Sequence, residues 1–222
     1  MKPKGIKIYT KNEKDEYLPL KAKISFDKTY QTISFKTKKL TPILISYKSQ
    51  VYSSAIIANK HWYSKYMNSG FENGTLDPKI EAAIKLTRGQ VAESLYKALD
   101  VQSQTSYTHQ FKDLKNHPNE NAIAYLKSLK VIKGYQDGTF KPNQEISRAE
   151  TLKIILEALD YKLTNGDTKL SDTIEKDWFN QYIFTGIDKG IINGFPDGSF
   201  KPHQNVNHAE FAKILYLANQ AK

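Results

Sequence analysis

The pattern of apolar and polar positions changes about a quarter of the way along the chain. Within residues 5–49 the two kinds alternate, as in Lys21–Phe26, and a turn-like Asp27–Tyr30 and an apolar run at Ile43–Ile45 follow. Alternation with a period of two is typical of β-strands. We therefore expect a small β-rich segment over residues 1–50, either a subdomain or the last strands of an upstream domain.

From about residue 54 the spacing becomes helical. Apolar residues recur at intervals of three and four along three segments: Val91, Leu95 and Leu99; Leu152, Ile155, Leu156 and Leu159; Phe211, Ile214, Leu215 and Ala218. Each segment predicts a helix with one apolar stripe. Two further helices are expected over Glu120–Leu129 and Phe179–Lys189. Because three stripes can converge, we expect a three-helix core with pseudo-threefold symmetry and the remaining helices outside it.

A block of sequence recurs with a fixed period. Gly134–Pro142 reads GYQDGTFKP, Gly194–Pro202 reads GFPDGSFKP, and a weaker upstream copy, Gly70–Pro78, reads GFENGTLDP. Such a period indicates one supersecondary unit that is repeated along the chain. The loops of the first two copies lie 64 residues apart, but the helix starts that follow are 60 apart. We therefore expect about four extra residues in the first copy, at Lys79–Lys85.

The Asp-Gly pairs in these blocks raise the question of calcium. Asp137-Gly138 and Asp197-Gly198 lack the alternating oxygen ligands and distal Glu of an EF-hand loop. A turn with glycine at positive φ explains them better. The aromatic residues that follow, Phe140 and Phe200, are expected to fill the core beneath the loop.

Each block is followed by a helix-start signal. The pairs Thr87 and Gln90, Ser147 and Glu150, and Asn207 and Glu210 have the spacing of a capping box. The residue after each cap is Arg88, Arg148 or His208. A cation at this position opposes the helix macrodipole, and the backbone N–H groups there have no partner within the helix. We interpret these residues as recruited to bind an anion, with a solvent-facing role as the alternative.

Taken together, these motifs resemble the S-layer homology (SLH) module. The residues that carry the resemblance are Phe111–Leu114, Leu126–Asn143 and Ile146–Glu150. The resemblance implies a mainly α fold, in which three SLH repeats form a pseudo-threefold prism around a three-helix core, preceded by the β-rich segment. The predicted repeats are residues 54–107, which are degenerate, 108–167 and 168–222.

The resemblance also implies a ligand. In the SLH family, grooves between the repeats hold a pyruvylated, anionic secondary cell-wall polysaccharide that is attached to peptidoglycan. The positions that match the family's groove residues are Arg88, Arg148, His208, Asp113, Asp172, Trp178, Trp62, Gly134, Tyr135, Gly194 and Phe195. Trp62 lies about eight residues closer to its loop than Trp178 does. Since His208 stands where arginine is usual, we expect a weaker groove there that strengthens below about pH 6.5.

The charge distribution limits the other partners. The chain has 222 residues and a net charge of +10, but residues 51–222 hold 21 basic and 19 acidic residues, whereas residues 1–50 hold 12 lysines and 4 acidic residues. Nearly neutral repeats do not favour nucleic-acid binding. No apolar run approaches the roughly 18–20 residues of a membrane span. We expect no nucleic-acid partner and no membrane insertion.

Candidate catalytic and metal-binding residues are lacking. The chain has no cysteine and no recognisable catalytic triad or phosphate loop. Its histidines do not have ligand spacing; they are His61, His109, His117, His203 and His208. We therefore expect no enzyme activity, no cofactor and no metal.

We expect a non-catalytic anchor at the bacterial cell surface, in the cell wall or the S-layer. A cargo domain is expected on the N-terminal side, and a signal peptide, which is not visible here, would precede this segment. Three alternatives stay open: a protein–protein module of a surface lattice, a fragment of a glycan-acting enzyme, and a nucleic-acid binder that acts through the lysine-rich first 50 residues.

Overall fold

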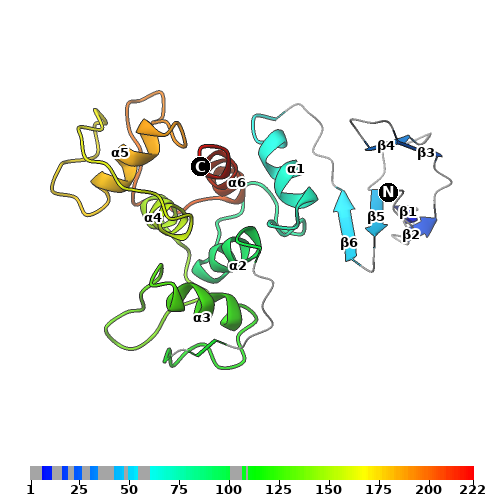
Figure 1. Ribbon diagram of the computed structural model, residues 1–222, viewed down its shortest axis with the longest axis horizontal. Coiled ribbons are helices and arrows are strands. Elements are labelled where there is room, and N and C mark those ends of the chain that lie inside the picture. The colour runs from blue at the N-terminus through cyan, green and yellow to red at the C-terminus, as the bar shows by residue number, and fades with distance from the viewer. Residues whose placement is uncertain are drawn as a thin grey trace. The chain divides into compact units, whose positions relative to one another are not determined.

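The computed structural model describes residues 61–100, 107–108 and 110–222, together with the backbone of strands within residues 7–54. The chain divides into two compact units, Met1–Ser64 and Lys65–Lys222 (Figure 1). In the part of the chain that is described, no helix combines the length and the apolar character needed to cross a membrane.

The N-terminal unit contains two antiparallel sheets. Its strands are β1 (Lys7–Lys11), β2 (Tyr17–Pro19), β3 (Lys23–Phe26), β4 (Gln31–Ser34), β5 (Ile43–Tyr47) and β6 (Gln50–Ser54). One sheet has the order β2-β1-β5-β6, and the other pairs β3 with β4. Phe26 lies opposite Gln31 in the antiparallel β3–β4 pair, and the turn-like Asp27–Tyr30 between these strands lies outside the described residues.

The C-terminal unit is helical, as predicted. Its described helices are α1 (Ser64–Glu72), α2 (Arg88–Ala98), α3 (Glu120–Ser128), α4 (Arg148–Ala158), α5 (Asn180–Asp188) and α6 (His208–Gln220). Figure 1 shows α2, α4 and α6 nearly end-on in the middle, with α1, α3 and α5 around them. The expected bounds of α3 and α5 differ from the observed ones by single residues.

The three central helices supply the core with the predicted stripes. Val91, Thr151 and Phe211 occupy the same position of the repeat, three residues after the helix-start cation, and all three are buried. The remaining predicted stripe residues are buried too, except Leu99, which is half-buried at the end of α2. A phenylalanine, a valine and a threonine thus share one layer of the core.

Backbone hydrogen bonds join the three repeats into a closed ring. The Leu86 N–H donates to Val206 C=O, the Val206 N–H to Ile146 C=O, and the Ile146 N–H back to Leu86 C=O, at N···O distances of 3.0, 3.0 and 3.1 Å. These residues precede the three capping boxes and lie 60 positions apart. Each repeat therefore contacts both others immediately before its central helix begins.

The first repeat keeps the turn but enters it differently. Gly74 has φ of 76°, close to the 81° of Gly138, and Asn73 takes the place of Asp137 in accepting from the Thr75 N–H and hydroxyl. Gly70, however, lies within α1, because this helix runs directly into the turn. The difference follows from the shorter segment between the first helix and the loop.

The extra residues of the first repeat lie earlier than expected. Ile80, Ala82 and Ile84 offer the carbonyls that accept from the N-terminal end of α6. They lie 60 positions before the carbonyls of Phe140, Pro142 and Gln144, which accept in the same way from the start of α2. The period is therefore restored at Ile80, and the expected placement at Lys79–Lys85 is wrong: the insertion ends before Ile80.

Candidate functional site

The loop of each strong repeat is braced by an aspartate from its own repeat. Asp113 Oδ1 accepts from the Phe140 N–H at 2.9 Å and its Oδ2 from the Lys141 N–H at 2.7 Å. Lys141 has φ of 58°, so the two hydrogen bonds fix a left-handed residue. Asp172 makes the same pair of bonds in the third repeat, at 2.8 and 2.7 Å. Both predicted aspartates thus hold the loop in place.

The Asp-Gly turns have the form that was predicted. Asp197 Oδ1 accepts from the Ser199 N–H and hydroxyl, and Gly198 has φ of 79°. These hydrogen bonds, chiefly the one from the Ser199 hydroxyl, lower the pKa of Asp197 to about 2. The pKa of Asp137 is lowered in the same way by Thr139. Phe140 and Phe200 are fully buried beneath the loops, as expected.

The loop glycines allow close packing within their own repeat. A Cβ atom on Gly134 would lie 2.2 Å from the ring of Phe111 and 2.6 Å from Thr139 C=O. On Gly194 it would lie 2.6 Å from the side chain of Leu170. Neither distance can be tolerated without a shift, so these glycines are required by packing.

All three capping boxes are present, but the backbone N–H groups at the helix starts are already paired. The cap side chains of Thr87, Ser147 and Asn207 accept from the N–H three residues later, and Gln90, Glu150 and Glu210 accept in return. The next N–H groups donate to the neighbouring repeat: Arg88 to Gln144 C=O, Arg148 to Gln204 C=O and His208 to Ile84 C=O, each at 2.9 Å. The expectation of unpaired N–H groups is therefore wrong, because tertiary contacts satisfy them.

The guanidinium of Arg88 crosses from the first repeat to the loop of the second. Its Nε donates to Phe140 C=O at 3.0 Å, and its Nη1 lies 3.3 Å from Glu150 Oε1. The guanidinium carbon lies 4.6 Å from the ring centre of Phe140 and 5.1 Å from that of Tyr135. The side chain is thus held between two aromatic rings and is only 7% exposed.

Arg148 repeats this arrangement between the second and third repeats. Its Nε donates to Phe200 C=O at 3.0 Å, and its Nη1 lies 3.5 Å from Glu210 Oε1. The guanidinium carbon lies 4.7 Å from the ring centre of Phe200 and 4.8 Å from that of Phe195. Burial lowers the pKa of Arg148, and the carboxylates of Glu210 and Asp172 oppose that shift. An arginine nonetheless stays charged at neutral pH.

A lysine also contacts the half-buried ring beside each buried arginine. Lys141 Nζ lies 4.1 Å from the ring centre of Tyr135, and Lys201 Nζ lies 4.4 Å from that of Phe195. Each of these rings therefore lies within cation–π distance of both a buried guanidinium and a partly exposed ammonium. We call these two sets the arginine junctions: Arg88, Tyr135, Phe140 and Lys141, and Arg148, Phe195, Phe200 and Lys201.

Each arginine junction retains free donors. Within the described residues, Nη2 of Arg88 and of Arg148 has no hydrogen-bond partner. Among the described residues, the ion-pair partners of these ammonium groups are the exposed turn carboxylates alone, Asp137 at 3.6 Å for Lys141 and Asp197 at 3.0 Å for Lys201. Sequence reasoning missed these lysines, although the repeated Phe-Lys-Pro of the loops was a signal that could have shown them.

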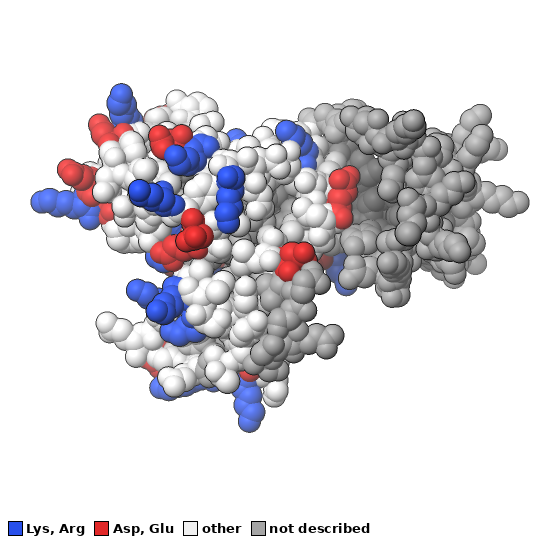
Figure 2. Space-filling view, in the orientation of Figure 1, with Lys and Arg blue, Asp and Glu red and all other residues white. Residues whose placement is uncertain are grey.

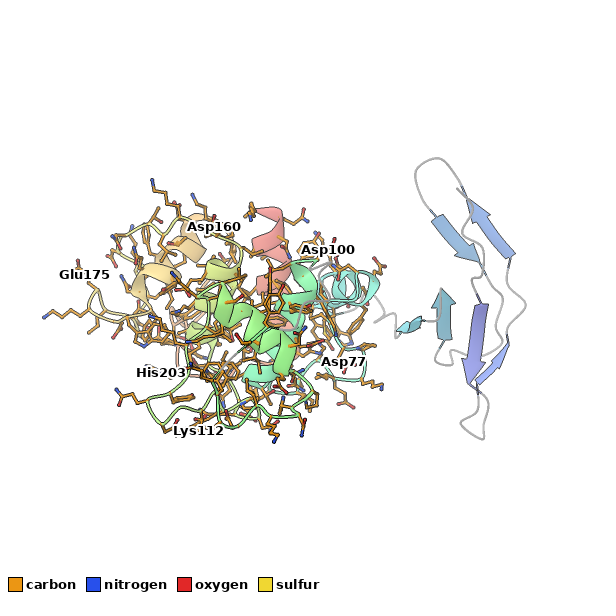
Figure 3. All side chains as sticks on the ribbon, turned by 60° about the horizontal axis from the view of Figure 1, so that its bottom comes forward. Asp77, Asp100, Lys112, Asp160, Glu175 and His203 are labelled. Atoms are coloured by element: carbon orange, nitrogen blue, oxygen red, sulfur yellow. The ribbon has the colours of Figure 1, made fainter. Side chains whose placement is uncertain are left out.

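The third junction repeats the hydrogen-bond pattern with a different charge. His208 Nδ1 lies 2.8 Å from Ile80 C=O and so carries the proton, and its ring meets that of Phe71 at 6.2 Å. Asp77, which is labelled in Figure 3, lies in the insertion before Ile80, and Glu81 is the residue 60 positions before Lys141. We call His208, Phe71, Ile80 and Asp77 the histidine junction.

His208 does not charge where the sequence suggested. It is 1% exposed, and burial lowers its pKa below 6.5 despite the Ile80 hydrogen bond and the charge of Asp77. Burial therefore moves the expected gain of a cation to a pH below 6.5. At neutral pH the histidine junction presents a neutral imidazole and a carboxylate.

The two tryptophans are exposed but lie outside the arginine junctions. Trp178 precedes α5, is 53% exposed and meets the rings of Phe179 and Tyr182 at 5.4 and 6.3 Å. Trp62 belongs to the N-terminal unit, where it meets Tyr63 at 5.4 Å and is 58% exposed. Both offer an accessible ring face to a ligand.

On the face shown in Figure 2, the described residues form no patch of one charge. Blue and red side chains are interspersed over the helical unit in Figure 2. Within the described ranges, no three His, Asp or Glu side chains form a group that could hold a metal ion, and His109 lies outside them. The recognition of an anion must therefore depend on individually placed groups such as the arginine junctions.

Comparison with known families decides the identity of the repeats. The S-layer homology domain matches residues 110–152 and 169–212. The chain carries S-layer homology domains. The two SLH matches contain the candidate residues of the second and third repeats, from Asp113 to His208, whereas Arg88 and Trp62 precede them.

Several bacterial proteins share this region. The chain is 32% identical over 155 residues to a cellulosome-anchoring protein of Acetivibrio thermocellus, which is 66% of this chain and 34% of the relative. It is 32% identical over 103 residues to a surface layer protein of Brevibacillus choshinensis, covering 45% of this chain and 9% of the relative. An amylopullulanase of Thermoanaerobacterium thermosulfurigenes is 31% identical over 151 residues, covering 64% and 8%.

The chain thus spans about a third or less of the length of these relatives. Its SLH domains assign it to the bacterial cell surface, in the cell wall or S-layer, where it serves as a cell-wall anchoring module. An SLH domain is a binding domain and not a catalytic one.

Proposed function

We propose that the two arginine junctions bind an anionic secondary cell-wall polysaccharide and so anchor an N-terminally attached cargo domain to peptidoglycan without covalent bonds. The observation that supports this most strongly is the free Nη2 of each buried arginine beside a partly exposed lysine ammonium. The pyruvyl ketal carboxylate is the group that we expect these donors to hold.

The chemistry of the junction suits a carboxylate on a sugar. A guanidinium held in place by Phe140 C=O and Glu150 has lost its rotamer freedom, so little further entropy is lost when it binds. Charge-assisted hydrogen bonds from Nη2 and from Lys141 would converge on one carboxylate. The edge of the ring between them, that of Tyr135, can pack against the sugar. Trp178 would extend this surface in the third repeat.

Two junctions on one rigid module act together on a repeating polymer. Once one arginine junction is occupied, the second meets the same chain at high effective concentration. Firm anchoring then requires no single tight site. The proposal involves no bond making or breaking, and we propose that this chain is not an enzyme.

Co-sedimentation with cell-wall sacculi tests the proposal. The probe variant is Lys141→Gln with Lys201→Gln, because these side chains are about 40% exposed and the loop is held by backbone bonds to Asp113 and Asp172. The matched control is Lys97→Gln, a lysine with a similar i,i+4 ion pair on α2.

Wild type and the control should sediment with sacculi and lose that ability once the secondary polymer is extracted. The double variant should bind at least about tenfold more weakly, since each charge-assisted contact contributes about 1.5 kcal/mol. Binding that survives extraction, or that the double variant retains in full, would refute the proposal. Competition by purified polysaccharide separates polymer binding from the protein–protein contacts of a surface lattice.

A further inference from the structure

A small cavity opens between α1 and α6, where the third repeat meets the first. It has a volume of about 70 Å³, well above the roughly 10–15 Å³ that one water molecule needs. We call it the α1–α6 cavity. None of the described residues that line it is charged, and His208 and the tryptophans are not among them.

The polar lining of the cavity consists of amides and a hydroxyl with free hydrogen-bonding capacity. It comprises Ser69 and Asn73 from the first repeat and Asn219 and Gln220 from the end of α6. Asn73 Oδ1 is occupied by Thr75, which leaves its Nδ2 group. Within the described residues, the amide side chains of Asn219 and Gln220 have no hydrogen-bond partner, and both residues are exposed.

Two tyrosines form the apolar side of the cavity. Tyr66 and Tyr216 meet edge to face, with ring centres 5.4 Å apart, and both stay partly exposed. Such rings pack well against the C–H face of a sugar, while neighbouring amides satisfy its hydroxyl or acetamido groups. Lys65 Nζ lies over the Tyr216 ring, 5.0 Å from its centre, but no charged side chain lines the cavity itself, so the lining suits a neutral hydroxyl or acetamido group.

The corresponding seam between α2 and α3 is closed. Tyr96 occupies the position of Tyr216, but its hydroxyl accepts from Asn121 Nδ2 at 3.3 Å. It packs on Tyr125, which Tyr107 covers in turn with ring centres 5.0 Å apart. The α1–α6 seam thus differs from the α2–α3 seam, and α1 runs directly into its turn.

We propose that the α1–α6 cavity binds an uncharged sugar residue, with a hydroxyl or acetamido substituent in the cavity and the ring against Tyr66 and Tyr216. This site is separate from the arginine junctions. Its natural source rests on the proposed function, because the ligand would be a neutral unit of the same wall polymer. The histidine junction would then lie beside a neutral sugar site, and the two arginine junctions would hold the charged groups.

Titration of the ¹⁵N-labelled chain with N-acetylglucosamine, a neutral acetamido sugar, tests the cavity. The side-chain amide signals of Asn73, Asn219 and Gln220 should shift in a saturable way. The test variant is Asn219→Ala, an exposed position. The matched control is Asn121→Ala, an asparagine beside the tyrosine pair of the closed seam.

Asn219→Ala should weaken the apparent affinity about fivefold, the effect of one lost hydrogen bond, and Asn121→Ala should leave it unchanged. The absence of saturable shifts, or shifts that Asn219→Ala does not weaken, would overturn the proposal.

The double variant Lys141→Gln with Lys201→Gln separates the two proposals. It should lose binding to the polymer and keep the full response to N-acetylglucosamine. A response to the monosaccharide without any binding of the polymer would refute the proposed function and leave the cavity supported. Binding of the polymer without a response to the neutral sugar would refute the cavity proposal and leave the proposed function supported.

Discussion

The arginine junctions and the histidine junction share one hydrogen-bond pattern and differ in charge. At all three, the first two N–H groups of the central helix donate to carbonyls of the next repeat, and the cation or imidazole donates to a third carbonyl. Only two of the three add a lysine that contacts the aromatic ring, and in the third the charge of Asp77 acts on the imidazole.

The difference teaches that the ring of repeats does not need a charged group in order to close. A neutral His208 makes the equivalent contact with Ile80 C=O, so a permanent cation is not a structural requirement. The chain contains only two arginines among 33 Lys and Arg residues, and both stand at these junctions. A planar guanidinium can hold the loop and still present a free nitrogen, which a lysine cannot do.

The largest expected effect is a loss of stability when the arginine side chain of a junction is removed. Arg148→Ala should lower the free energy of unfolding by about 3 kcal/mol, because Glu210 is left without its partner and a buried gap opens between two rings. Urea denaturation measures the loss. A loss below about 1 kcal/mol would show that the guanidinium adds little to the joining of the repeats.

A second prediction concerns a variant in which the histidine junction carries an arginine and a lysine. His208→Arg with Asp77→Lys should give a third anion site, because two cations replace a neutral imidazole and a carboxylate. It should raise the apparent affinity for the extracted polymer about tenfold through the additional contact. Equilibrium binding measures the gain, with His208→Arg alone as the control. If the affinity stays the same although the variant is folded, the side chains of the junction do not determine recognition.

A smaller effect on stability is expected from a substitution at the buried position that is equivalent in α2, α4 and α6. Thr151 Oγ1 is buried without a hydrogen-bond partner among the described residues, whereas Val91 holds the same position in α2. Thr151→Val should raise the free energy of unfolding by about 1 kcal/mol, because a hydroxyl no longer has to lose its water. Val91→Thr should lower it by a similar amount. A destabilised Thr151→Val would point to a partner that the hydroxyl keeps.

The smallest expected effect is the acid dependence of the histidine junction. The pKa of His208 is lowered in the folded state, so below about pH 6.5 the unfolded chain binds more protons than the folded one. The stability contributed by neutral His208 is complete above that pH and falls as the pH is lowered. Urea midpoints between pH 7.5 and pH 5 should therefore drop more for wild type than for His208→Gln. Parallel curves would show that His208 does not titrate differently on folding.

The local features of this chain could be read from its sequence. The turns around Gly138 and Gly198, the capping boxes and the bounds of α3 and α5 depend on neighbouring residues, and all of them are confirmed. The mainly helical class followed from the stripes of the central helices. Such patterns are local, so the printed order of residues suffices for them.

The features that were missed depend on contacts between repeats. The helix-start N–H groups of Arg88 and Arg148 are satisfied by residues more than 50 positions away, which no local pattern shows. Glu150 has the same kind of double role: it completes its own capping box and pairs with Arg88 of the preceding repeat. The pKa of His208 could not be predicted either, since it is set by burial against the first repeat.

The fact that the chain has only two arginines makes a direct test possible. The Nε–H signals of Arg88 and Arg148 can be followed by NMR while purified wall polysaccharide is added to the ¹⁵N-labelled chain. We predict that both signals shift in a saturable way, together with the backbone amides of Lys141 and Lys201, while those of Ile80 and Ala82 stay in place. Shifts confined to the histidine junction, or binding that leaves both arginine signals unchanged, would contradict the account.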